Sequence, residues 1–215
     1  MATANSARER ILDRIRKAEV PLDPAIDSTK IGLEQIYASI DDPLQRLLLE
    51  CAANLIEVKV TEDQRASLHA FAELLSAVPM GSLYVQDDPM LRHFTDAYVG
   101  REVMWSTAGR APEDCQASIT LCEGLVAQTG SILSSSRCGG RGGSIVPPTH
   151  IVYATSDQIV PDITLALQTA MQSNLIEASY FGLISGSSRT ADIEKILVQG
   201  AHGPIKVAIV LEMRS

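Results

Sequence analysis

Apolar positions along the chain follow two periods, one typical of helices and one typical of strands. Pro43–Asn54 and Glu62–Ala77 carry apolar residues at helical spacing, and Pro43 suits a first helical turn. Thr61 is the expected N-cap of the second helix. Further helices are expected at 31–40, 87–98 and 163–172.

Short β-branched runs separate these helices and predict strands. The expected strands are Leu55–Val60, Ser82–Gln86, Val103–Ser106, Ala117–Leu121, Ser131–Ser134, His150–Ala154, Tyr180–Ile184 and Ile205–Leu211. Gly124–Gly130 is expected to be a connection between the strands Ala117–Leu121 and Ser131–Ser134. Strands that alternate with helices predict an α/β fold, in which helices flank a mostly parallel sheet.

The N-terminal segment differs from the rest of the chain. Residues 3–18 predict a basic amphipathic helix with a thin apolar stripe, and 20–29 contain two prolines typical of a linker. We therefore expect residues 1–30 to be a helical arm and linker, and residues 31–215 to be one α/β domain. Two interpretations of the arm stay open: a solvated helix, or a contact with a partner or a second subunit.

Charge and hydropathy exclude some classes of function. The 215 residues carry a net charge of −8, which argues against binding nucleic acid. No apolar run approaches the roughly 20 residues of a membrane span, and the N-terminus lacks the apolar core of a signal peptide. The expected location is the cytoplasm.

The four cysteines show no C-x-x-C spacing, so we expect neither an iron–sulfur cluster nor another metal site in this chain. The sequence does not identify a cofactor. Cys138 lies between Arg137 and Arg141, whose charges favour a lower thiol pKa. It is the one loop thiol worth testing for reactivity, and the other cysteines are expected to be small buried apolar residues.

The segment Tyr180–Leu211 carries the main candidate site. It predicts a strand, a small polar turn at Ser185–Thr190, a helix at Ala191–Val198 and a second strand. A turn that opens a helix presents free N–H groups to an anion, and Arg189 adds a positive charge. The alternative is a tight turn that only caps the helix. The predicted anion-binding residues are Thr129, Gly130, Ser185, Gly186, Ser187, Ser188, Arg189, Thr190 and Asp192.

Three features could complete this site. His202, in a glycine-flanked turn, is either a proton-transfer group or a structural turn residue. Gly130 is expected to supply a positive φ or a close approach to a ligand. Arg137 and Arg141 lie in a glycine-rich segment that is either a mobile flap or a disordered surface loop.

Five motifs together resemble the LUD domain family, in the stand-alone form of the lactate-utilization C proteins. They are QTGSIL (128–133), PPTHIV (147–152), QIVPD (158–162), SGSSRTADIE (185–194) and GAHGP (200–204). The resemblance covers about 114–211. The chain departs from the family pattern at Gln128, where an acid is common, and at Ser187, where a proline is common.

The resemblance implies a NagB/RpiA/CoA-transferase-like fold and a role in bacterial oxidation of L-lactate to pyruvate, beside iron–sulfur partner proteins that hold the clusters. The chain would then be the component without a cluster. Two alternatives stay open: a free-standing enzyme for a phosphorylated, folate or acyl-CoA substrate, and an assembly protein that binds through Ala7–Lys17. A homo-oligomer is also open.

Overall fold

The structure is a computed structural model that describes residues 7–17, 39–109, 111–172, 178–190, 198–199 and 203–214. The chain divides into two units, Met1–Ala38 and Ser39–Ser215. The described part of the first unit is the helix α1 (Ala7–Lys17). The helix expected at 31–40 lies mostly outside the described residues, and the predicted domain boundary at residue 30 stays a prediction.

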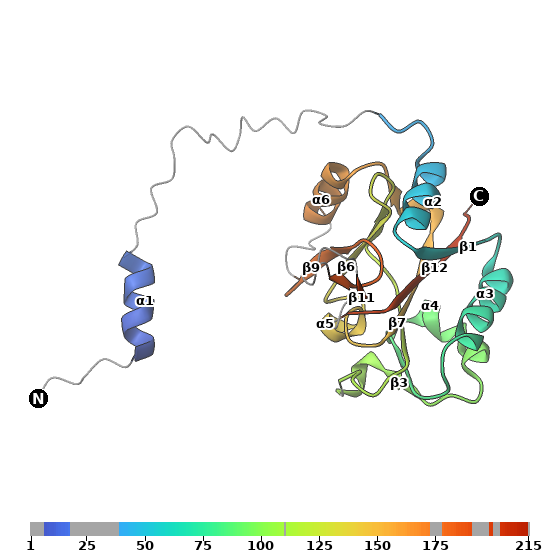
Figure 1. Ribbon diagram of the computed structural model, residues 1–215, viewed down its shortest axis with the longest axis horizontal. Helices are drawn as coiled ribbons and strands as arrows, with labels where there is room; N and C mark the ends of the chain where they lie inside the picture. Colours follow the sequence, from blue (N-terminus) through green and yellow to red (C-terminus); the bar gives the residue numbers. More distant parts are fainter. Residues whose placement is uncertain are drawn as a thin grey trace, which may run out of the picture. The chain divides into compact units, whose positions relative to one another are not determined.

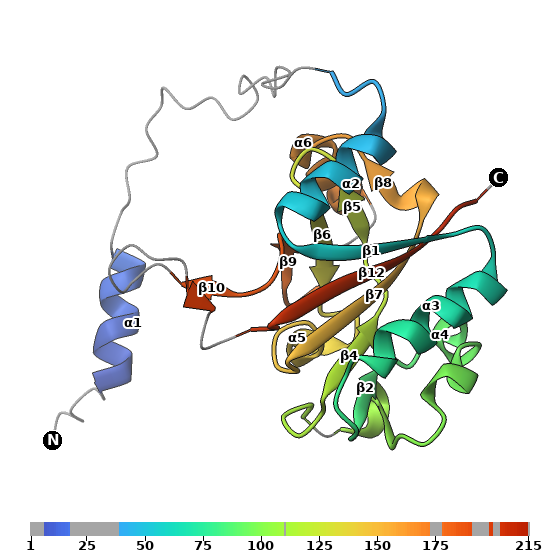
Figure 2. The same ribbon diagram turned by 45° about the vertical axis from the view of Figure 1, so that its right-hand side comes forward.

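The second unit is built on a six-stranded sheet in which every neighbouring pair is parallel (Figures 1 and 2). The strand order is β1-β12-β7-β4-β2-β3. The strands are β1 (Ile56–Thr61), β2 (Leu83–Val85), β3 (Val103–Trp105), β4 (Ala117–Thr120), β7 (Thr149–Thr155) and β12 (Lys206–Glu212). This confirms the α/β class with a mostly parallel sheet.

A second, four-stranded sheet has the order β8-β5-β6-β9. Its strands are β5 (Gly124–Val126), β6 (Ser131–Ser135), β8 (Ile159–Val160) and β9 (Phe181–Ile184). β6 is antiparallel to both β5 and β9. The connection expected at Gly124–Gly130 contains the strand β5, which was not predicted because its residues are all buried and show no alternation.

Three apolar clusters hold the layers together. The first lies between the six-stranded sheet and α3 (Gln64–Ser76), α4 (Pro89–Arg92) and the 3-10 turn η1 (Thr95–Tyr98). The second fills the space between this sheet, α2 (Pro43–Ala53) and the four-stranded sheet. The third joins the four-stranded sheet to α6 (Ile163–Gln172). The six-stranded sheet is therefore covered on both faces, and α6 covers part of the outer face of the four-stranded sheet.

Side-chain caps fix where the helices begin. Asp42 accepts a hydrogen bond from the Gln45 amide at the start of α2. Asp63 does the same for the Ala66 amide at the start of α3, so the expectation that Thr61 caps this helix was wrong. Thr61 instead ends β1. The helix expected at 87–98 is also interrupted, since α4 ends at Arg92 and η1 follows it.

The remaining short helical segments are η2 (Ser106–Ala108), α5 (Gly140–Gly143) and η3 (Ser156–Gln158). Within the described part of the chain, no helix has the length and apolar character needed to cross a bilayer.

Candidate functional site

A chain of hydroxyl groups joins two of the predicted site residues. The Thr129 Oγ1 lies 2.7 Å from the Ser131 Oγ, which lies 2.6 Å from the Ser185 Oγ. The β6–β9 register causes this, because Ile132 pairs with Ile184 and the preceding and following serines come together. Ser131 is almost fully buried. Sequence analysis missed Ser131 because its partner is distant in sequence.

Two glycines allow the turns beside Thr129 and Ser185 to pack closely against the C-terminal end of α2. Gly130 has φ +59°, and a Cβ there would lie 2.6 Å from the Cys51 nitrogen. Gly186 has φ +108°, and a Cβ there would lie 2.5 Å from the Asn54 carbonyl oxygen. The positive φ expected of Gly130 is thus present, but the close approach is to α2 and not to a ligand.

The helix end has an electrostatic consequence. Asn54 caps α2, and its side-chain amide donates to the Thr129 carbonyl over 2.8 Å. A helix C-terminus carries the negative end of the helix dipole, which disfavours an anion. An anion held beside Thr129 and Ser185 therefore needs a compensating cation.

The turn after β9 does not open a helix at Arg189. Arg189 and Thr190 form β10, which pairs antiparallel with β11 (Val198–Gln199). The predicted helix Ala191–Val198 is therefore wrong at its last residue, and 191–197 lie outside the described residues. β10 ends at Thr190 and the residues that directly follow it are not described, so the helix-dipole argument for anion binding at this turn stays a prediction.

The segment Tyr180–Leu211, expected to be one strand–turn–helix–strand unit, has its two long strands, β9 and β12, in different sheets. The turn after β9 and the turn before β12 nevertheless meet, because the Ser188 amide donates to the Pro204 carbonyl over 2.9 Å. Asp192 and His202 lie outside the described residues, and for Arg189 and Thr190 the structure describes the backbone alone.

The glycine-rich segment is packed and is not a free surface loop. Arg137 forms a two-pronged ion pair with Glu123, with Nη2–Oε2 at 2.8 Å and Nε–Oε1 at 3.1 Å. Arg141 donates to the Ser179 carbonyl. The Tyr84 hydroxyl donates to the Gly139 carbonyl over 2.8 Å. Both arginines are engaged by the protein, and opening of this segment as a flap stays a prediction.

The lower pKa that Arg137 and Arg141 favoured for the Cys138 thiol is not found. Its side chain is 3% exposed, and burial raises the pKa of the Cys138 thiol to about 11. Glu123, whose carboxylate accepts from the thiol over 3.7 Å, also opposes ionisation. The neighbouring Arg137 cannot lower the pKa of this thiol because its charge is paired with Glu123.

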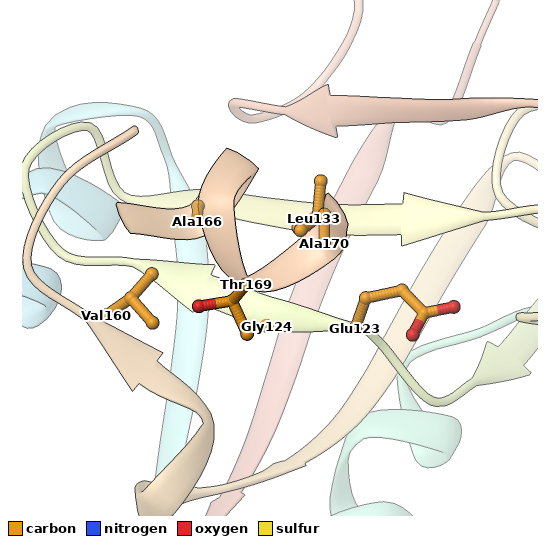
Figure 3. Close-up of a pocket in the computed structure, with 7 residues that line it drawn as sticks. All are labelled: Glu123, Gly124, Leu133, Val160, Ala166, Thr169 and Ala170. Atoms are coloured by element: carbon orange, nitrogen blue, oxygen red, sulfur yellow. The ribbon is translucent and has the colours of Figure 1, made fainter. Parts of the chain in front are cut away.

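Glu123 borders a small cavity between α6 and the four-stranded sheet (Figure 3). Burial raises the pKa of this carboxyl, but hydrogen bonds from Arg137 and Ser135 outweigh it and hold the pKa below its usual range. The cavity measures about 20 Å³, which is room for about one water molecule. It is too small to be a substrate site.

A larger groove lies where β1 and β12 end. It has a volume of about 590 Å³ and is lined by Glu62, Asp63, Gln64, Arg65, Glu212, Met213 and Arg214. The Glu212 Oε2 accepts from the Ser67 hydroxyl at 3.0 Å and from the Tyr153 hydroxyl at 2.9 Å. Open parallel sheets bind ligands beyond their carboxyl strand ends. A polar residue directly after an apolar strand was the signal that could have found Glu212.

His150 is buried between the sheets. Its Nε2 lies 2.9 Å from the Thr120 Oγ1, and burial lowers the pKa of the imidazole to about 4. It is therefore neutral near pH 7. Among the described residues, no three His, Cys, Asp or Glu side chains come together in a way that could hold a metal ion.

The LUD domain sequence profile matches residues 2–211, nearly the whole chain. The chain belongs to the LUD domain family. This LUD domain protein is 27% identical to lactate utilization protein C of Macrococcus caseolyticus over 86% of its own length and 82% of that protein. It is 29% identical to lactate utilization protein C of Geobacillus thermodenitrificans, over 80% and 79% of the two chains.

A solved structure shares the fold. The crystal structure of a DUF162 family protein from Deinococcus radiodurans superposes with a TM-score of 0.63 at 17% identity, covering 80% of this chain and 96% of that one. At this identity the likeness establishes the fold alone.

Proposed function

We propose that this LUD domain protein takes part in lactate utilization, as a component without a cluster in a system that oxidises L-lactate to pyruvate beside iron–sulfur proteins. Two relatives named lactate utilization protein C, which align over about four fifths or more of both chains, support this role. The absence of C-x-x-C spacing in the sequence fits a chain that leaves electron transfer to its partners.

We further propose that the chain binds a small carboxylate beside Ser185–Thr190. The observation that carries this is the hydroxyl chain Thr129–Ser131–Ser185, which brings three neutral hydrogen-bonding groups from two segments to one place. Such groups suit a 2-hydroxy acid, whose carboxylate and hydroxyl both need hydrogen-bond partners. The Arg189 guanidinium supplies the cation that the nearby C-terminus of α2 makes necessary.

The remaining predicted residues take supporting roles in this proposal. Gly130 and Gly186 let the two turns approach α2. Asp192 orients Arg189, and His202 moves a proton. The chemistry completed by the partners would be the removal of two electrons and two protons from the hydroxy acid.

A genetic test addresses the role. A lactate-utilizing bacterium that lacks its own C protein should regain growth on L-lactate when it carries this chain with its native partner genes. An Arg189→Ala variant should fail to restore growth while the protein accumulates normally. Full growth with Arg189→Ala, or growth without this chain, contradicts the proposal.

A binding test addresses the site. Thermal unfolding would be followed with L-lactate, pyruvate, phosphate, coenzyme A and a folate. A ligand at 100 times its Kd stabilises a protein by about 2.7 kcal/mol, which is a clear shift in Tm. We expect the shift with L-lactate or pyruvate, and its loss in Ser131→Ala and Arg189→Ala.

Matched control variants distinguish the proposed site at Ser131 and Ser185 from the groove at the carboxyl ends of β1 and β12. Ser134→Ala removes a buried hydroxyl from the same strand, and Glu212→Gln alters the groove at the carboxyl strand ends. Both should keep the ligand-induced shift. A shift that Glu212→Gln abolishes and Ser131→Ala retains would move the ligand to the groove and refute the proposed site.

A further inference from the structure

The strand β9 forms an edge of the four-stranded sheet. The Ser136 amide donates to the Tyr180 carbonyl over 2.9 Å, in the same register that pairs Gly182 with Ser134. Hydrogen-bonded and non-hydrogen-bonded pairs alternate along an antiparallel ladder. The backbone groups of Phe181 and Leu183 therefore point away from β6, and within the described ranges no strand pairs with them.

The side chains of the same two residues are exposed. Phe181 is 47% exposed and Leu183 is 38% exposed. They lie opposite Ser135 and Leu133 of β6, and Leu133 packs against α6. Phe181 and Leu183 therefore extend the apolar face of the sheet beyond the part that α6 covers.

This edge lacks the usual protection against pairing. Edge strands are normally guarded by charged residues, especially lysine, or by proline. The segment Ala178–Ser188 contains no charged residue and no proline, although the whole chain has a net charge of −8. An uncharged strip is where two such acidic chains can meet without strong repulsion.

We propose that β9 pairs antiparallel with β9 of a second copy of this chain, about a two-fold axis at Gly182. In this register Phe181 lies opposite Leu183 of the second copy, and Leu183 lies opposite Phe181 of the second copy. Both are hydrogen-bonded pairs, since these residues carry the outward backbone groups. The two four-stranded sheets become one continuous sheet.

A second copy fits this edge because the edge is self-complementary. One two-fold operation satisfies the outward N–H and C=O groups of both residues and places each exposed apolar side chain against another. The axis falls on a glycine, so no side chain meets its own copy there. Ser185 then lies roughly 10 Å from the axis at 3.3 Å per residue, so two ligand sites, if the proposed function holds, flank the interface.

The first experiment measures the mass of the full chain by light scattering and sedimentation, without any ligand. The monomer has a mass of 23.1 kDa, and we expect twice this value for the wild type. Leu183→Lys should give a monomer with an unchanged circular dichroism spectrum and a Tm that no longer depends on protein concentration. Val99→Lys, at an apolar position that is 81% exposed on another element, should remain a dimer.

A cross-linking experiment tests the register. Gly182 faces its own copy in a non-hydrogen-bonded pair, with Cα atoms about 4.5 Å apart, which a disulfide can span. The four native cysteines are at most 6% exposed and should not compete. Gly182→Cys should give a covalent dimer under mild oxidation, whereas Leu183→Cys should not.

Three results would overturn the proposal. The first is a wild type that stays monomeric, including one that binds an iron–sulfur protein at this edge instead. The second is a dimer unaffected by Leu183→Lys, and the third is cross-linking through Leu183→Cys and not through Gly182→Cys. None of these outcomes depends on lactate, so they are distinct from failure of the proposed function.

Discussion

The buried imidazole of His150 should make the stability of this protein fall steeply in mild acid. His150 is 0% exposed on β7, its Nε2 pairs with Thr120, and its Nδ1 has no hydrogen-bond partner among the described residues. Burial lowers the pKa of the folded-state imidazole from 6.5 to about 4. Between pH 6.5 and about pH 4, the imidazole therefore binds a proton in the unfolded chain but not in the folded chain.

The sign of the effect follows from this difference. The stability that neutral His150 contributes is complete above the unfolded pKa of 6.5 and is lost as the pH falls through the window down to about 4. A gap of this size corresponds to roughly 3 kcal/mol below pH 4 and roughly 2 kcal/mol at pH 5. This is a large share of the stability of a typical domain.

The assay compares urea unfolding of the wild type and His150→Gln at pH 7 and pH 5. Glutamine keeps an amide that can reach Thr120 but cannot take up a proton. The wild type should lose roughly 2 kcal/mol more between the two pH values than the variant. Carboxyls with a lowered pKa, such as Glu57 and Asp157, also make the folded protein less stable in acid. Because both proteins contain them, their effect cancels in the difference between wild type and variant.

His69→Gln, at an exposed position of α3, is the matched control and should follow the wild type. Equal pH dependence in the wild type and His150→Gln would refute the reasoning. It would mean that water reaches the imidazole or that a nearby group shares its proton.

Three other predictions concern packing around the candidate site. Gly130→Ala should destabilise the chain by roughly 2 kcal/mol or more in urea unfolding, because a Cβ at φ +59° is strained and would also overlap α2; an unchanged midpoint would contradict the geometry. Ser134→Ala should be neutral or stabilising in the same assay, because the buried Ser134 hydroxyl has no hydrogen-bond partner among the described residues, and a clear loss of stability would reveal an unseen one. Cys138 should react slowly with a thiol reagent at pH 7 in the native protein and fast in urea, because burial raises the pKa of its thiol to about 11 and restricts access; fast native labelling would disprove this.

Local sequence pattern predicted most of the elements of this LUD domain protein. The apolar stripes of α2 and α3 report a helical period, and the continuous β-branched runs of β7 and β12 mark buried strands, each within one segment. The predictions were wrong where contacts with segments distant in sequence determined the structure. Thr61 resembled a helix cap but continues β1, and β5 lacks alternation because both its faces are buried.

The candidate site shows the same division. The sequence singled out Thr129, Gly130 and the turn after Ser185, and gave the family through its motifs. Only strand pairing joined Thr129 to Ser185 through Ser131, because Ser131 and Ser185 are 54 positions apart and meet through the β6–β9 register. Only burial decided that the Cys138 thiol stays protonated, because the cost of removing the thiolate from water exceeds the stabilisation that nearby groups give it. The sequence thus determined which segments become helices and strands, whereas long-range pairing and burial decided which side chains meet and how they ionise.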